Sequence, residues 1–432
     1  MKEEWNRFRK YARGIRVLRV DASTDLLTPD VLLALQLRTN NEPLLPRLEC
    51  FVCKNTTGDF IPSIPLFLSP KTTNISITFA PDSPTVTIAL TIVRFPTLCP
   101  HITTLILKPL PRNPTITEAV SEMLLACNRD TLRMFFVDSP LTEDARRTLY
   151  KLPELRGLWA TIKGPTSLPR VTLPNLEVVF IQWDSGCDWL QGFRGATIGK
   201  LKTIILHSLS GPTQIGKFLE EFQSTASTTS AQNTLSKFTL YTPQSWTPNY
   251  TSLLGFRQMT NLRIEFSCHI NCSSNVDDNI VIDLAQAMSQ LEVLSLGRHP
   301  CRAVGGVTFK GLIALALHCP QLSKLRVHFQ ANRLAKATST TDPPSPSDPS
   351  AVIPQTNCAL TGLQVGEIPI SESSVLAVGL TLLRIFPKIF NIEYINPQWG
   401  SVAEMVKLSK RIDSHIHHAS KSHLPPTPDD SW

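Results

Sequence analysis

The sequence predicts an α/β solenoid, with a parallel sheet on the concave side and helices on the convex side. A six-residue pattern, apolar–x–x–apolar–x–apolar, returns along the chain from near residue 15 to near residue 394. Helix-like segments, many of them followed by a short proline turn, separate the copies. The copies follow one another at intervals of roughly 21 to 38 residues, and such a period is typical of solenoids.

The repeated pattern matches L-x-x-L-x-L, which is the strand signature of a leucine-rich repeat. Clear copies are IRVLRV at 15, ITTLIL at 102, LRMFFV at 132, LEVVFI at 176, LKTIIL at 201, LSKFTL at 235, LEVLSL at 291, LSKLRV at 322 and LTGLQV at 360. Weaker copies are LECFVC at 48, NISITF at 74, LRGLWA at 155 and IFNIEY at 389. We therefore predict one leucine-rich-repeat horseshoe of about 13 units. The strand register stays open near residues 48–80 and 259–268, where the apolar residues also fit a phase shifted by one.

The segments between the strand motifs are expected to be helices that lead the chain back to the sheet. The segments with this pattern are residues 117–130, 142–152, 215–223, 279–290 and 309–319. Several precede a proline turn, as in CPHI at 99 and CPQL at 319, and proline ends a helix because it lacks the backbone donor. The interval between the motifs at 155 and 176 is too short for a full helix, so an irregular or short helical return is expected there.

Four parts of the chain are distinguished by their patterns. Residues 1–14 carry an apolar stripe at helical spacing that begins at Trp5 and Phe8, which predicts a helix that caps the first repeat. Residues 15–412 form the solenoid. Residues 338–356 are rich in Pro and Ser, so this insertion is expected to be disordered, and residues 413–432 are expected to be a flexible tail.

Composition limits the function classes. No run of apolar residues is long enough for a membrane span, and the N-terminus lacks the apolar core of a signal peptide, so a cytoplasmic or nuclear location is expected. The net charge is +7, and the first twenty residues hold seven Lys/Arg against two Glu. A solvated helix face explains this cluster better than a nucleic-acid site, because no nucleic-acid-binding motif accompanies it.

The sequence shows no motif for catalysis or for binding a cofactor or a metal, so we expect a protein that is not an enzyme. Cys50 and Cys53 form a C-x-x-C pair, but residues three apart on a strand face opposite ways and cannot easily share a metal. Cys268, His269 and Cys272 have ligand-like spacing, yet no second pair of ligands stands nearby.

The alternating positions of the strand motifs are the candidates for partner binding, because they face the concave surface when the leucines face the core. These candidates are Met134, Phe136, Trp159, Phe180, Tyr241, Lys324, Arg326 and His328. Exposed aromatic residues are typical of binding surfaces. A shift of the strands by one residue would place the same side chains in the core, and the sequence leaves both possibilities open.

The opening segment W-x-x-F-x-x-Y-A-x-x-I-R-x-L, which includes Trp5, Phe8 and Tyr11, resembles a segment of the F-box/leucine-rich-repeat families of mushroom-forming fungi, and the Cys-Pro pairs at 99 and 319 fit the same families. The resemblance implies that the repeats hold the protein substrate of a ubiquitin ligase, while an F-box docks on the Skp adaptor. Only four residues precede Trp5, so no F-box is recognised, and a Skp-type adaptor is expected as a partner only if an F-box lies upstream. The expected function is protein recognition as the substrate-binding region of such a receptor; the alternative is a free-standing repeat scaffold.

Overall fold

A computed structural model describes residues 2–23, 27–39, 42–162, 173–183, 200–208, 220, 223–224, 233–242, 250–266, 276–297, 306–331, 356–365, 370–394 and 396–422. The chain divides into two compact units, and each is described by itself. The first unit comprises Met1–Ser210 and Glu220–Leu235, and the second comprises Gly211–Leu219 and Ser236–Trp432.

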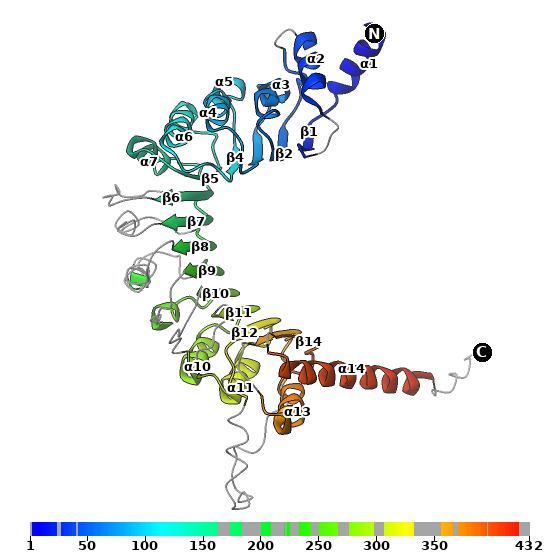
Figure 1. Ribbon diagram of the computed structural model, residues 1–432. Coiled ribbons are helices and arrows are strands. Elements are labelled where there is room, and N and C mark those ends of the chain that lie inside the picture. Colours follow the sequence, from blue (N-terminus) through cyan, green and yellow to red (C-terminus); the bar gives the residue numbers. More distant parts are fainter. Residues whose placement is uncertain are drawn as a thin grey trace, which may run out of the picture. The chain divides into compact units, whose positions relative to one another are not determined.

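The first unit contains eight of the described strands, and each pairs in parallel with the next one along the chain. The strands are β1 Val17–Asp21, β2 Cys50–Thr56, β3 Asn74–Phe79, β4 Thr104–Lys108, β5 Met134–Pro140, β6 Gly157–Ile162, β7 Val178–Trp183 and β8 Thr203–Ser208. The helices are α1 Lys2–Ala12, α2 Pro29–Thr39, η1 Ile61–Ser63, α3 Ile64–Phe67, α4 Thr85–Val93, α5 Phe95–Leu98, α6 Pro114–Ala126 and α7 Glu143–Leu149. In Figure 1, α3 to α7 lie along one side of these strands.

The second unit repeats the arrangement with six described strands, which also pair in parallel and in chain order. The strands are β9 Lys237–Thr242, β10 Asn261–Phe266, β11 Val293–Leu296, β12 Lys324–Val327, β13 Gly362–Val365 and β14 Asn391–Glu393. The helices are η3 Tyr250–Leu253, α10 Asp278–Ala287, α11 Phe309–His318, η5 Glu372–Ser374, α13 Val375–Ile385 and α14 Gln398–Ser422. The predicted alternation of parallel strands and helices is therefore confirmed in both units.

The apolar positions of the repeated motif form the core between the strands and the helices. In the copy at 291, Leu291, Leu294 and Leu296 are 0%, 0% and 2% exposed, as the pattern predicts. The ambiguous copy near residue 262 is also in phase, because Met259 takes the first position, and Leu262 and Ile264 follow it into the core. The side chains that alternate with these positions lie on the opposite face of the strands, which we call the open face.

Side-chain caps fix where several helices begin. The Asn113 side chain accepts a hydrogen bond from the Ile116 backbone N–H at 2.9 Å, and Pro114 follows it at the first helical position of α6. Asp277 caps α10 in the same way, through the backbone N–H of Ile280 at 2.9 Å. The helices predicted at 117–130, 142–152, 279–290 and 309–319 are thus observed as α6, α7, α10 and α11, while most of 215–223 lies outside the described residues.

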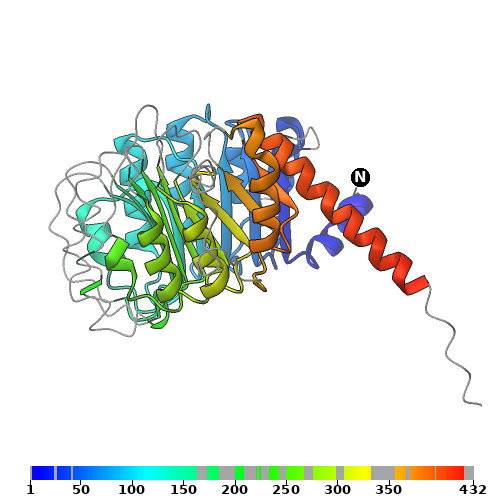
Figure 2. The same cartoon turned by 90° about the horizontal axis from the view of Figure 1, so that it is seen from below.

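The two ends of the chain are both helical. The helix expected at residues 1–14 is α1, of which Ala12 is buried, while Arg9 forms an exposed ion pair with Glu42 at 3.2 Å. At the other end, α14 packs against α13 and β14 and is the long red helix of Figure 2. The sequence predicts a tail from residue 413; this boundary is corrected, because α14 runs to Ser422. Residues 423–432, and nearly all of the insertion expected at 338–356, lie outside the described residues.

Candidate functional site

A ladder of apolar side chains crosses the open face of the first unit. It is formed by one residue from each of five adjacent strands, β4 to β8, which the parallel pairing places side by side. All five side chains are partly exposed. We call this set the apolar ladder, and its members are Ile106, Phe136, Trp159, Phe180 and Ile205.

The alternation of each strand explains why these side chains are available. Leu158 and Val179, which precede Trp159 and Phe180, are 1% and 3% exposed in the core, so the aromatic residues that follow them must face the other way. Of the two possibilities that the sequence leaves open, the structure shows the open face for Trp159 and Phe180. Met134 and Phe136 lie on the same face, and both pack over Gly157, where an added Cβ would come within 2.6 Å of the Met134 Sδ.

Trp159 is the centre of the ladder. Its ring centroid lies 4.1 Å from that of Phe180, with a tilt of 40° between the planes. The Lys108 ammonium stands 5.9 Å from the Trp159 ring centroid, within the range of a cation–π interaction. The Trp159 indole N–H has no hydrogen-bond partner among the described residues, although the nitrogen is shielded from solvent.

Polar side chains border the apolar ladder on the same face. Asp138 on β5, Thr161 on β6, Gln182 on β7 and His207 on β8 follow the ladder residues by two positions, and Thr161 and Gln182 are almost completely buried. Burial raises the pKa of the Asp138 carboxyl above its usual value, while Arg112, the Thr161 hydroxyl and His207 act in the opposite direction. The Asp138 Oδ1 and Thr161 Oγ1 atoms nevertheless make no hydrogen bond of ordinary geometry with a described residue.

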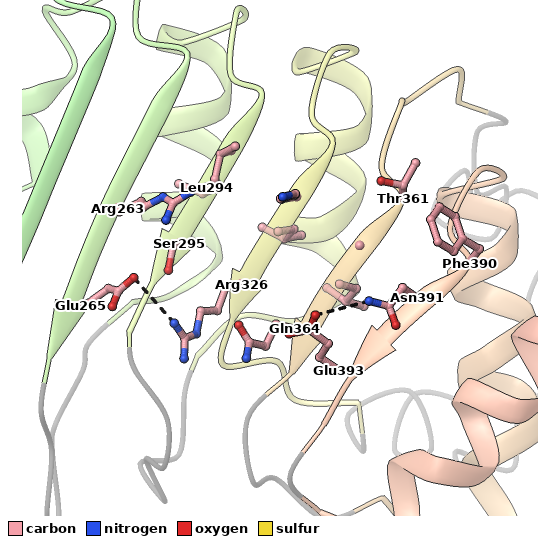
Figure 3. Close-up of a pocket in the computed structure, with 15 residues that line it drawn as sticks. Arg263, Glu265, Leu294, Ser295, Arg326, Thr361, Gln364, Phe390, Asn391 and Glu393 are labelled. Carbon is pink, nitrogen blue, oxygen red and sulfur yellow. Dashed lines mark hydrogen bonds and ion pairs between the residues drawn. The ribbon is translucent and has the colours of Figure 1, made fainter. Parts of the chain in front are cut away.

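The open face of the second unit is charged and contains a pocket of about 430 Å³ over β10 to β14. Figure 3 shows Arg263, Ser295 and Arg326 on three adjacent strands, with Glu265 joined to Arg326 by an ion pair. These three positions are in register, as are Gln364 on β13 and Glu393 on β14. We call this hollow the charged pocket.

The other predicted binding residues lie in different places in the second unit. Lys324 and Arg326 line the charged pocket, as expected for the open face. Tyr241 is partly exposed on β9, opposite Glu265. His328 differs from the prediction, because it lies just beyond the end of β12, is only 8% exposed, and contributes little open surface.

The conformation of Gly297 explains the burial of His328. Gly297 has φ +99°, and a Cβ built there would approach the His328 ring atoms to 2.8 Å. The missing side chain therefore leaves the space that the imidazole fills, at the end of β11.

Several residues of these surfaces were not predicted. Ile106 and Ile205 occupy the same motif position as Trp159, so the repeated pattern could have identified them as residues of the open face. Arg263 was not predicted because the first position of its motif is Met and not Leu. Ser295 was not predicted because its small side chain gives no sign of a binding role. Phe390, which is 57% exposed at the rim of the charged pocket, belongs to a weak copy of the motif.

The cysteines with described surroundings are mostly core residues. Cys53 is 1% exposed and faces the core, while Cys50 lies on the open face, so the two point in opposite directions as predicted. Burial raises the pKa of the Cys53 thiol to about 11 and that of Cys127 to about 12. The described residues contain no cluster of side chains suited to a metal ion, and Cys268, His269 and Cys272 lie outside them.

No protein-family model matches the sequence, and no curated protein matches it significantly. Among the described residues, none of the helices combines the length and the apolar character that crossing a membrane requires.

Proposed function

We propose that this chain is a leucine-rich-repeat module that recognises another protein through the open face of β4 to β8. The observation that carries the proposal is the apolar ladder, in which five adjacent strands each present a partly exposed apolar side chain. A contiguous apolar strip costs free energy in water, and it is typical of surfaces that a partner covers.

The chemistry of the ladder fits a protein partner. Aromatic residues on paired strands are held in place before binding, so they lose little side-chain entropy when a partner covers them. Trp159 and Phe180 are already packed together.

A narrower form of the proposal rests on the resemblance of the opening segment and of the Cys-Pro turns. In this form the repeats hold the substrate of an F-box-type ubiquitin ligase. The alternative is a free-standing repeat scaffold that binds its partner without a ligase. The narrower form requires the Skp adaptor in the same complex, and the alternative does not.

Affinity capture with a matched set of variants tests the proposal. The native chain and Val86→Ala, which alters a 63% exposed residue on α4, are expected to capture the same proteins. Trp159→Ala is expected to weaken the binding of each captured partner by about 2 kcal/mol or more, as for an interface hot spot. Thermal melts followed by circular dichroism establish that each variant is folded.

The outcomes separate the candidates. Ile106→Glu is a second test at the edge of the ladder, where an added charge should oppose an apolar partner without emptying the aromatic stack. Retention of every partner by both variants would contradict the proposal. Capture of the Skp adaptor by the full-length gene product, together with a Trp159-dependent partner, supports the ligase form, whereas that partner without the adaptor supports the scaffold.

A further inference from the structure

The charged pocket of the second unit is a site of different chemistry from the apolar ladder. Its walls carry three cations, Arg263, Lys324 and Arg326, and two carboxylates, Glu265 and Glu393. Glu265 is committed to Arg326, since the Arg326 Nη1 lies 3.7 Å from the Glu265 Oε1 and both side chains are mostly buried. Positive charge therefore exceeds negative charge around the pocket.

The two remaining cations are not neutralised by any residue that the structure describes. The Arg263 Nε donates a hydrogen bond to the neutral Asn261 Oδ1 at 3.1 Å, and neither Arg263 nor Lys324 forms an ion pair within the described part of the chain. Glu393 lies on β14, where the Asn391 amide donates to it at 3.3 Å (Figure 3). Arg263 on β10 and Lys324 on β12 are thus available to anionic groups.

Ser295 provides an independent sign of a missing ligand. Its side chain is only 5% exposed and lines the pocket, in register between Arg263 and Arg326. The Ser295 Oγ has no hydrogen-bond partner among the described residues. A buried hydroxyl without a partner costs roughly 1–3 kcal/mol, and an anionic oxygen placed between the two arginines would remove that cost.

We propose that the charged pocket binds an extended peptide segment that carries Asp or Glu side chains. This inference rests on the proposed function, because it names the chemistry of a segment that a protein partner would present. One carboxylate is held by Arg263 and the Ser295 hydroxyl, and a second is held by Lys324. The exposed ring of Phe390 receives an apolar side chain of the same segment at the rim.

The spacing of the cations favours two carboxylates over one phosphate. Arg263 and Lys324 are two strands apart and two residues out of register, which corresponds to roughly 12 Å across a sheet. Side chains two residues apart on an extended peptide are separated by about 7 Å, and the long side chains of Arg and Lys cover the difference. A single phosphate group would require both side chains to bend toward one point, whereas two carboxylates let each cation bind its own group.

Gly362 offers a clean way to test the pocket. It lies on β13 beside Lys324, and a Cβ added there meets no atom within 4 Å. Gly362→Ala is therefore the structural control. Gly362→Glu places a carboxylate in the pocket, whereas Gly362→Lys fills a similar volume with the opposite charge.

The experiment measures fluorescence anisotropy of a labelled peptide in which Glu alternates with Ala and one Phe stands near the end. The full chain should bind it, and binding should weaken as salt is raised, because exposed charges are screened. We expect Gln in place of Glu in the peptide to weaken binding at least tenfold. Gly362→Glu should do the same, while Gly362→Ala and Gly362→Lys retain binding. Ser295→Ala should weaken binding several-fold with no loss of stability.

Other results overturn the inference. Equal binding of the Gln peptide, or an equal loss with Gly362→Glu and Gly362→Lys, would show that the charge of the ligand is not recognised. Binding only when a phosphoserine replaces one Glu, with competition by inorganic phosphate, would identify a phosphate site instead. If the peptide fails to bind while Trp159-dependent capture persists, the pocket proposal fails and the proposed function stands.

Discussion

At the scale of single residues, Leu294 and Ser295 show how one strand serves two purposes. They are neighbours on β11, yet Leu294 is 0% exposed in the core and Ser295 faces the pocket with an unpartnered hydroxyl. We expect Leu294→Ala to lower the free energy of unfolding by about 2–5 kcal/mol, because it empties a packed site. Ser295→Ala should leave it unchanged or slightly higher. Urea denaturation of both variants measures this, and equal losses would contradict the assignment of faces.

Asp138 gives a prediction about pH. Burial raises the pKa of its carboxyl in the folded protein, so the folded state binds more protons than the unfolded state between the usual value of 3.8 and the raised value. The contribution of Asp138 to stability therefore falls as the pH rises through the folded pKa. Asp138→Asn should raise Tm near neutral pH, and the gain should shrink as the pH is lowered through that window. Asp82→Asn, at an exposed position, is the control, and a lower Tm for Asp138→Asn at neutral pH would contradict the prediction.

The sequence predicted the direction of some side chains better than that of others. Trp159 and Phe180 could be assigned to the open face in one phase of the motif, and only the packed core on the other side of β6 and β7 selected that phase. His328 could not be placed, because its burial depends on the close approach permitted by Gly297, which directly follows β11 in another repeat. A pattern of apolar residues does not predict whether a hydroxyl such as that of Ser295 has a hydrogen-bond partner.

At the scale of elements, a carboxylate joins two successive helices. Asp278 in the first turn of α10 accepts hydrogen bonds from the Thr308 backbone N–H at 2.7 Å, the Thr308 hydroxyl at 2.6 Å and the Gly311 backbone N–H at 3.0 Å. It therefore satisfies donors at the N-terminal end of α11, where negative charge is favourable.

Removing this carboxylate should loosen the joint between α10 and α11. Asp278→Ala is expected to lower the free energy of unfolding by roughly 1–3 kcal/mol, because buried donors lose their acceptor. Asp278→Asn should cost less, since its amide oxygen can still accept. Glu292→Gln, at an exposed position just before β11, removes the same charge and should have little effect. A loss from Glu292→Gln as large as that from Asp278→Ala would show that net charge, and not the joint, is responsible.

Helices with an apolar stripe and a following turn were predicted well, as α10 and α11 show. The helix α14 was cut short in the prediction. Its buried residues Trp399, Val402, Ala403 and Val406 recur at spacings of three and four, whereas Leu408 and Ile412, which continue the helical spacing, are 57% and 51% exposed. The sequence keeps apolar residues at this spacing as far as Ile416 and Ala419, so the pattern allowed a longer helix than the one predicted.

At the scale of the whole molecule, the repeat pattern places chemically different side chains at equivalent positions of the two units. The fifth position of the motif is Ile, Phe or Trp on β4 to β8, and it is Arg, Ser, Arg, Gln or Glu on β10 to β14. The core positions remain apolar in both units. The fold was therefore predictable from the core positions, whereas the surface chemistry became clear only when register aligned residues from separate motifs.

The repeat architecture also predicts how a local defect spreads. In a repeat array each unit contacts its neighbours in sequence, so destabilisation raises local opening mainly nearby. Leu105 on β4 and Leu294 on β11 are both 0% exposed and belong to different units. We expect Leu294→Ala to accelerate amide hydrogen exchange in β10 to β12 and to leave β3 to β5 unchanged, with the reverse for Leu105→Ala. Hydrogen-exchange mass spectrometry measures both, and the double variant should lose the sum of the single effects within about 0.5 kcal/mol. Equal acceleration in both units by either variant would mean that the chain unfolds as one cooperative block, because a defect in one unit would then open the other.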